Sequence, residues 1–186
     1  METNECILSI DIGIHNIGYA VYDINTKEIT FGLYDTDKKL TSADKKANVV
    51  VTRTKYIHMF ISDMFAKYNI KKVIIERQVN NNTMAMEFMY LITSAVYSYC
   101  ENIIIFDPKL KFTTLGLTYN TKNKAHKKLS IQIVKGYITK YYPHLLDTFN
   151  ENSKQDDISD AILMILVHIN KNDIDQLAAI KNVISS

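Results

Sequence analysis

Four acidic residues of this sequence lie at positions where a carboxylate is hard to accommodate. Asp11 stands inside the apolar run ILSIDI, residues 7–12, and Glu76 ends the apolar run VIIE. Asp157 and Asp160 are three residues apart near the start of a strongly apolar segment, so in a helix they share a face. Burying an unpaired carboxylate is unfavourable, and such a group tends to take up a proton. These four residues are therefore the first candidates for chemistry.

Divalent cations would explain these carboxylates if the fold brings them together. Four converging acids repel one another, and Mg²⁺ is a hard cation that prefers oxygen ligands. Two such ions about 4 Å apart can stabilise the attacking and the leaving oxygen in phosphodiester cleavage. Mn²⁺ suits the same oxygen ligands. The pattern therefore predicts a site for two Mg²⁺ ions, in which Mn²⁺ can substitute.

Some of these acids also have a purely structural explanation. Glu76 could form a charge pair with Arg77 at the strand end. Asp156 follows Ser153 at the spacing of a capping box, and an acid in the first turn suits the helix dipole, which could also account for Asp157. Asp11 is the hardest to explain in this way, because nothing structural requires a carboxylate in the middle of a strand.

Composition indicates one domain and leaves the type of partner open. The chain has 186 residues, of which 47% are hydrophobic, so we expect a single domain over residues 1–186, with a core of about 6–170 and a helical tail at 171–186. The net charge of +2 does not by itself demand a nucleic acid. Lysines gather in TKNKAHKK, residues 121–128, where no acid is present, and such a cluster can bind phosphates.

Other classes of protein find little support. No apolar run reaches the roughly 18 residues of a membrane span, and the first residues do not resemble a secretory signal. Cys6 and Cys100 match no metal-ligand spacing, so we expect two buried free thiols and an intracellular location. The five histidines show no zinc spacing.

Hydrophobic periodicity predicts the order β-β-β-α-β-α-β-α-α. Residues 6–12 form the first strand, the turn HNIG leads into the second, and NTKE leads into the third. Helical spacing follows at 57–68, 84–99, 129–142 and 153–169, with strands at 71–78 and 101–108 between the first three helices. A long loop at 107–122 is a candidate functional segment. Three antiparallel strands followed by alternating units predict an α/β fold, a mixed five-stranded sheet flanked by helices, which is the ribonuclease H-like order. In this order the first and fourth strands are neighbours, which would place Asp11 beside Glu76.

The quoted motifs resemble the RuvC-like Holliday junction resolvases. SIDIGIHNIGYAV, IIERQ and DDISDAI are similar to the family's three acidic motifs, and the D-x-G-x-x-N start and the E-R-Q strand end favour its poxviral and mitochondrial branch. The matching residues are Asp11, Gly13 and Asn16, then Glu76, Arg77 and Gln78, then Asp156, Asp157 and Asp160. The likeness spans about residues 7–170. The lysine-rich segment falls where the family has a basic helix start, although poxviral relatives are richer in arginine there.

The resemblance implies an Mg²⁺-dependent homodimeric nuclease that cuts four-way DNA junctions by paired symmetric nicks. It implies that Asp11 bridges two ions, that Glu76 and Asp160 hold them, and that Asp157 completes the site. Either Lys127 or Lys128 would supply the active-site lysine, and the spacing does not decide between them. We expect DNA contacts from Lys122, Lys124, Lys127, Lys128, Arg77 and Asn16, a possible base stack on Tyr119, and a dimer face on the helix at 84–99. The lysine-, asparagine- and isoleucine-rich composition suits an AT-rich viral genome, and such a virus would use the enzyme at cytoplasmic replication sites.

Two alternative functions remain open. The same nuclease fold could act on RNA–DNA hybrids or flaps instead of junctions. The start D-x-G followed by a hairpin also opens the sugar-kinase and actin-like ATPase fold, but that fold lacks the E-R-Q strand end and the paired aspartates. We therefore expect no nucleotide cofactor and no membrane partner.

Overall fold

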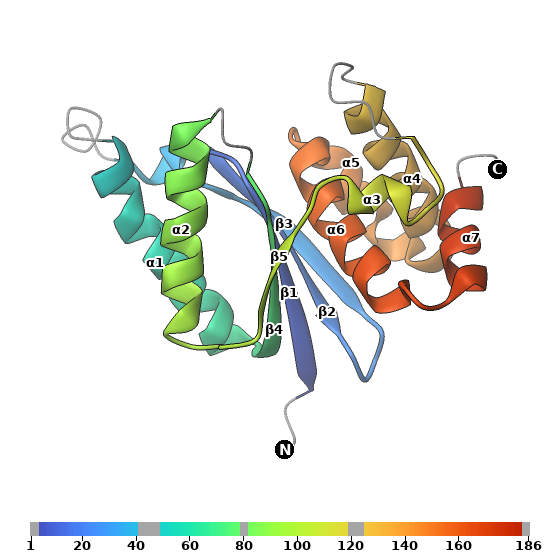
Figure 1. The fold of residues 1–186 in the computed structure, drawn as a ribbon, viewed down its shortest axis with the longest axis horizontal. Coiled ribbons are helices and arrows are strands. Elements are labelled where there is room, and N and C mark those ends of the chain that lie inside the picture. The colour runs from blue at the N-terminus through green and yellow to red at the C-terminus, as the bar shows by residue number, and fades with distance from the viewer. Residues whose placement is uncertain (1–3, 41–48, 79–81, 119–124, 184–186) are drawn as a thin grey trace.

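A mixed five-stranded sheet forms the centre of the molecule (Figure 1). The computed structural model describes residues 4–40, 49–78, 82–118 and 125–183. The strands lie in the order β3-β2-β1-β4-β5. Their bounds are β1 Glu5–Ile12, β2 Asn16–Asp23, β3 Ile29–Asp35, β4 Asn69–Glu76 and β5 Ile103–Phe106. The predicted antiparallel meander, and the predicted pairing of the first strand with the fourth, are confirmed.

The alternation of side chains along β1 decides which groups face which helices. Leu8, Ile10 and Ile12 pack with α1 (Val49–Lys67) and α2 (Thr83–Tyr97). Ile7 packs on the opposite face with α6 (Gln155–Asn170), and Asp11 follows it at the same two-residue period. Asp11 is thereby directed to the face of the sheet that α6 covers.

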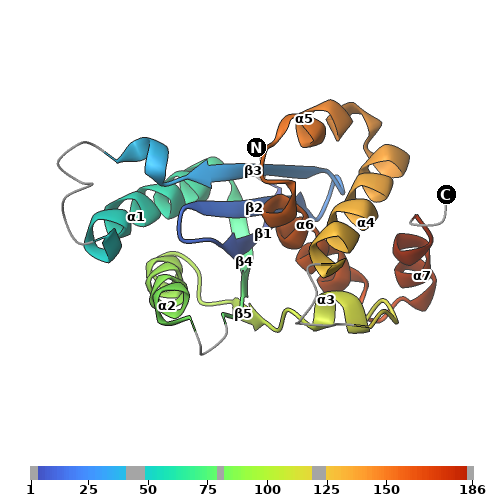
Figure 2. The same cartoon turned by 90° about the horizontal axis from the view of Figure 1, so that it is seen from above.

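Two helical layers enclose the sheet (Figure 2). Helices α1 and α2 cover one face, and α6 with α4 (Ala125–Tyr141) covers the other. No residue of α6 between 158 and 167 is solvent-exposed, on any side of the helix. This burial explains why the apolar positions of α6 run almost all round the helix.

Two short helices and two 3-10 turns were not predicted. They are α3 Leu110–Thr113, α5 Leu146–Glu151, η1 Asp37–Lys39 and η3 Pro143–Leu145, whereas α7 Ile174–Asn182 lies within the helical tail expected at 171–186. The first of them lies inside the segment expected to be a long loop. Its four residues are too few for a detectable helical period.

Four details of the sequence prediction are wrong. The second strand already begins at Asn16, inside the expected HNIG turn. Ser153 does not cap α6, whose N-cap residue is Lys154 with no side-chain cap. Cys100 is only partly buried, and neither cysteine forms a disulfide. The first helix, expected at 57–68, already begins at Val49.

Within the described residues, no helix is long and apolar enough to cross a membrane.

Candidate active site

Three carboxylates from three elements meet at one edge of the sheet. Asp11 comes from the end of β1, Glu76 from the end of β4 and Asp160 from the first turns of α6. Ile10 pairs with Ile75 in the parallel ladder, so Asp11 and Glu76 come next on neighbouring strands. One oxygen of each carboxylate lies within 4.8 Å of the others. The proximity inferred from the predicted topology is present.

A glycine allows α6 to approach the sheet closely enough to complete this cluster. Gly18 pairs with Asp11 across the first hairpin. A Cβ atom at Gly18 would lie 2.4 Å from the carbonyl oxygen of Asp157. That neighbour is backbone and cannot turn aside, so any larger residue would displace the start of α6. Gly18 therefore determines how closely the start of α6, which carries Asp157 and Asp160, packs against the sheet.

A buried lysine, which the sequence reading did not single out, lies among the carboxylates. Lys111, in the short helix α3, is only 2% exposed. Its Nζ lies 2.5 Å from Glu76 Oε1 and 3.0 Å from Asp160 Oδ1. The sequence predicted that this residue lies in the long loop at 107–122, a candidate functional segment. Instead, the lysine neutralises part of the negative charge of the cluster.

Ser130 holds Asp160 from the other side. Its buried hydroxyl donates a hydrogen bond to Asp160 Oδ1 at 2.8 Å. Ser130 lies on α4, one turn after the predicted basic residues. This bond ties the lysine-bearing helix directly to a candidate metal ligand.

Burial and mutual repulsion shift the pKa values of these acids in different directions. Burial, and then the neighbouring Glu76, raise the pKa of Asp11 well above its usual range. Burial also raises the pKa of Asp160, against the opposing effect of Lys111. Burial would raise the pKa of Glu76 too, but Lys111 and hydrogen bonds outweigh it, so this pKa is lowered. Burial therefore favours the protonated forms of Asp11 and Asp160, whereas Lys111 favours the ionised form of Glu76.

The fourth predicted acid lies on the rim of the same pocket. Asp157 lines a cavity of about 440 Å³ together with Asp11, Glu76 and Asp160. Burial, and then repulsion from Asp156, raise the pKa of Asp157 to about 6. Asp157 is not one of the three carboxylates whose oxygens lie within 4.8 Å of one another. Asp157 therefore lines the same cavity as the three clustered carboxylates but lies outside their cluster.

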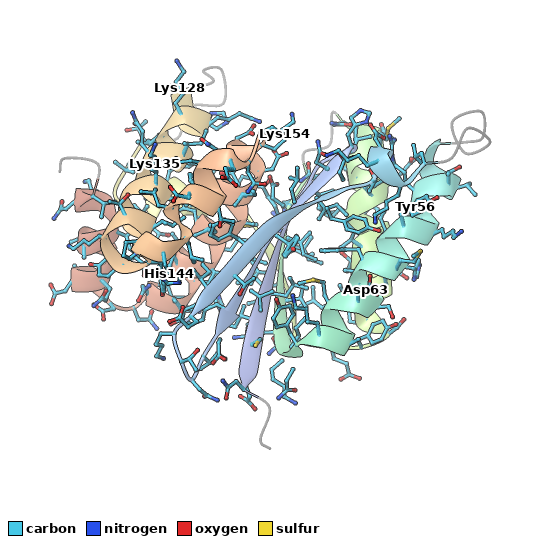
Figure 3. The ribbon with its side chains drawn as sticks, turned by 180° about the vertical axis from the view of Figure 1, so that it is seen from behind. Tyr56, Asp63, Lys128, Lys135, His144 and Lys154 are labelled. Carbon is cyan, nitrogen blue, oxygen red and sulfur yellow. The ribbon has the colours of Figure 1, made fainter. Side chains whose placement is uncertain are left out.

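Of the two candidate lysines, only Lys127 lines this cavity. Its Nζ lies 2.6 Å from Asp156 Oδ2, and this contact raises the pKa of Lys127 against the effect of burial. Asp156 therefore pairs with a lysine of α4, and the predicted capping box with Ser153 is absent. Lys128 is exposed and extends from the start of α4 away from the core (Figure 3).

The remaining predicted DNA contacts lie in different settings. Arg77 lines the cavity with an exposed side chain, while its backbone N–H donates to the carbonyl oxygen of Phe106. Asn16 begins β2, and its backbone carbonyl leaves no room for a Cβ at Gly13. Lys122, Lys124 and Tyr119 lie outside the described residues.

The turn after Asp11 is braced by an ionic cluster that sequence reasoning also missed. His15 Nδ1 lies 2.6 Å from Asp37 Oδ2, and the other Asp37 oxygen accepts from the buried guanidinium of Arg53. The Thr36 hydroxyl donates to the carbonyl oxygen of His15 at 2.8 Å. These contacts join the turn to β3 and α1. The His15 side chain is exposed, but Asp37 holds its ring in place.

The donor set fits a divalent metal ion. The three clustered groups are all carboxylates, the ligands that hard cations such as Mg²⁺ and Mn²⁺ prefer. Carboxylates this close repel one another, and within the described residues the ion pairs of Lys111 are with Glu76 and Asp160 only. A cation would lower this repulsion.

Comparison with known proteins identifies the family. The family model described as Poxvirus A22 protein matches residues 5–172. The chain belongs to this family. A fowlpox virus (strain NVSL) protein named Holliday junction resolvase is 26% identical over 155 residues, which cover 83% of this chain and 86% of that protein.

Solved structures share the fold. The yeast mitochondrial Holliday junction resolvase Ydc2 superposes with a TM-score of 0.62 at 16% identity, covering 96% of this chain and 83% of that one. Thermus thermophilus RuvC, in a complex with a Holliday junction substrate, gives a TM-score of 0.57 at 13% identity, covering 91% of this chain and 97% of that one. The predicted fold class, and the predicted likeness to the poxviral branch of the RuvC-like proteins, are confirmed.

Proposed function

We propose that this protein is a Holliday junction resolvase, a structure-selective endonuclease that makes paired symmetric nicks in four-way DNA junctions. The observation that carries the proposal is the cluster of Asp11, Glu76 and Asp160 at the ends of two adjacent parallel strands. Membership of the poxvirus A22 family supports it, as does the name of the fowlpox relative.

The side chains divide into metal ligands and groups that bind phosphate. Asp11, Glu76 and Asp160 would hold Mg²⁺, for which Mn²⁺ could substitute, and Asp157 would complete a two-ion site. Bound metal would lower the pKa of a water nucleophile and stabilise the departing 3′ oxygen. Lys127, which faces the cavity, would bind the negatively charged phosphate.

Lys111 has two roles in this proposal. Its ammonium group holds the Glu76 and Asp160 carboxylates in place, and it lines the cavity in which the scissile phosphate would lie. Lys128 and Arg77 would contact the DNA backbone farther from the reacting bond. Such contacts position the duplex without reading its sequence.

Symmetric nicks would follow from a two-fold dimer, because it presents two identical sites to a junction of matching symmetry. The outward side of α2 is a candidate interface, since Met84, Tyr90 and Tyr97 are 38%, 60% and 59% exposed. Analytical ultracentrifugation of the wild type and of Tyr90→Glu tests this interface. We expect the wild type to be a dimer and the variant to be a monomer. If the variant is also a dimer, the interface lies elsewhere.

A cleavage panel tests the function. Purified protein with Mg²⁺ is incubated with an end-labelled four-way junction, a linear duplex, a flap and an RNA–DNA hybrid, and Asp11→Asn is the matched control. Symmetric nicks in the junction alone, lost in the variant and in EDTA, are expected. Cleavage of the hybrid or flap in place of the junction would support the alternative nuclease. Junction binding without cleavage of any substrate would rule out an enzyme.

The family also bears on where the protein acts. We propose that it works inside the infected cell at cytoplasmic sites of viral DNA replication. Fluorescence microscopy of the tagged protein beside newly labelled viral DNA tests this location.

A further inference from the structure

A second and larger pocket lies at the end of the sheet remote from the acidic cluster. Its volume is about 660 Å³. Its walls come from β1, β2 and β4, the turn between β2 and β3, the C-terminal ends of α4 and α6, and α7. It shares no lining residue with the acidic cavity. Helix α6 connects the two: Asp160 faces the acidic cavity, and His168, eight residues or about 12 Å farther along the axis, faces the second pocket.

Positive charge lines this pocket. Lys27, Lys72 and Lys171 all contribute to its wall, and no aspartate or glutamate does. Within the described part of the chain, none of these three lysines forms a salt bridge. The nearby Asp23 carboxylate is already engaged, because it accepts hydrogen bonds from the Asn4 side chain and from two turn N–H groups. Asp23 acts electrostatically on Tyr22, and Glu28 on Tyr142, but neither carboxylate lines the pocket or forms a salt bridge with these lysines.

A partly buried histidine in the wall lies close to these lysines. Lys72 Nζ lies 3.4 Å from His168 Nε2. Burial, and then the positive charges of Lys72 and Lys171, lower the pKa of His168. The imidazole is therefore held neutral, and a bound anion would allow it to take up a proton.

Tyrosines form the other part of the wall. Tyr22, Tyr137, Tyr141 and Tyr142 line the pocket. The ring centroids of Tyr137 and Tyr141 lie 4.7 Å apart, and those of Tyr137 and Tyr142 lie 5.9 Å apart. The Tyr142 hydroxyl donates to the carbonyl oxygen of Lys27 at 2.6 Å, which fixes this ring. Tyr141 is 42% exposed, with Lys140 Nζ 5.1 Å from its ring centroid, so part of its ring is accessible to a planar partner.

We propose that this pocket binds a nucleotide, with the base against the tyrosines and the phosphate against the lysines. Base stacking on aromatic side chains and phosphate contacts to lysine are the two interactions by which proteins bind nucleotides without reading the base. A pocket that carries both, and no carboxylate, suits an anion with an aromatic ring better than an acidic peptide or a bare phosphate. The nucleotide is either free or the 5′ end of a DNA strand. This site is separate from the proposed nuclease site.

Binding is measured by calorimetry with deoxyadenosine 5′-monophosphate in EDTA. EDTA removes any metal that could bridge the probe to the carboxylates of the acidic cavity, and substitutions in the second pocket assign the heat to that pocket. We expect binding by the wild type and by Asp11→Asn. Lys72→Gln and the exposed Lys171→Gln should each weaken it roughly tenfold, the change for losing a charged hydrogen bond. Lys71→Gln is the matched control, because Lys71 is exposed on the same strand and does not line the pocket; its affinity should equal that of the wild type.

Two further measurements identify the ligand. Tyr141→Leu should weaken binding of the monophosphate by roughly fivefold or more, the effect of a lost stack, without changing the weaker binding of inorganic phosphate. The pKa of His168, followed by NMR of its ring, should rise on addition of the monophosphate.

The outcomes separate the possibilities. A 5′-phosphorylated tetranucleotide that binds while the monophosphate does not, with the same dependence on Lys72, would assign the site to a strand end. Inorganic phosphate that binds as tightly as either would overturn the proposal, since the base would then contribute nothing. The absence of binding by any of these probes to the folded wild type would also overturn it. Equal weakening by Lys71→Gln and Lys72→Gln would show non-specific attraction and reject the pocket.

Discussion

Replacing Lys111 by methionine tests the electrostatic account of the acidic cluster. Methionine has a similar volume and no charge, so the substitution removes the ammonium group and leaves little cavity. The lysine is 2% exposed and contacts Glu76 at 2.5 Å and Asp160 at 3.0 Å. Removing one partner of a buried ion pair costs about 3–5 kcal/mol, because the remaining charge stays uncompensated. Domains of this kind have about 5–15 kcal/mol of stability in total, so the loss is large.

The effect should depend on pH in a defined direction. Without Lys111, the pKa values of Glu76 and Asp160 rise, because the nearby positive charge that lowers both is gone. A carboxyl group whose pKa is higher in the folded protein than in the unfolded chain binds its proton first in the folded state. Stability then falls as the pH rises through that range. The destabilisation of Lys111→Met should therefore be larger at pH 8 than at pH 5.

Urea unfolding in EDTA, followed by circular dichroism at both pH values, measures this difference. Lys109→Met is the matched control, since Lys109 is exposed and precedes the same short helix. Its unfolding midpoint should equal that of the wild type at both pH values. The reasoning would be refuted if Lys111→Met unfolded like Lys109→Met, or if its destabilisation were independent of pH.

Three further substitutions test how the site is assembled. Ser130→Ala removes the hydrogen bond to Asp160 and should raise the Mg²⁺ concentration for half-maximal cleavage by about tenfold, as loss of a ligand's partner commonly does; an unchanged metal titration would contradict this role. Lys127→Met should lower kcat by about 100-fold, whereas Lys128→Met should weaken junction binding with kcat retained; kinetics that reverse this order would assign the catalytic lysine to Lys128. Gly18→Ala should lower stability by about 1–3 kcal/mol, because its Cβ meets the backbone of α6 at 2.4 Å; calorimetry that shows an unchanged Tm would disprove the close approach.

The sequence was sufficient to predict that Asp11, Glu76 and Asp160 lie close together, because each carboxylate interrupts or ends an apolar pattern. A carboxylate within a buried strand, such as Asp11, has few structural explanations, and the alternation along β1 also fixes the face to which it points. The order of strands followed from the same periodicity. Short crossovers and the antiparallel start left few other arrangements of the sheet.

The lysines could not be assigned in this way. A lysine in a polar segment usually lies in solvent, and nothing in the local sequence marks Lys111 as buried. Its position depends on how α3 docks against α6, a tertiary contact over about fifty residues of sequence. The choice between Lys127 and Lys128 depends on the helical phase of α4, and two adjacent residues point about 100° apart. The capping box failed for a related reason: the Asp156 carboxylate contacts Lys127 on another helix.

These findings indicate why a candidate metal site contains a buried lysine. Three carboxylates within 4.8 Å would drive apart the strand ends and α6 when no metal is bound. Lys111 contacts two of the three, one from the sheet and one from the helix, so it holds the two layers together. The raised pKa of Asp11 removes part of the remaining charge by favouring its protonated form. The fold around the site is therefore expected to persist without metal.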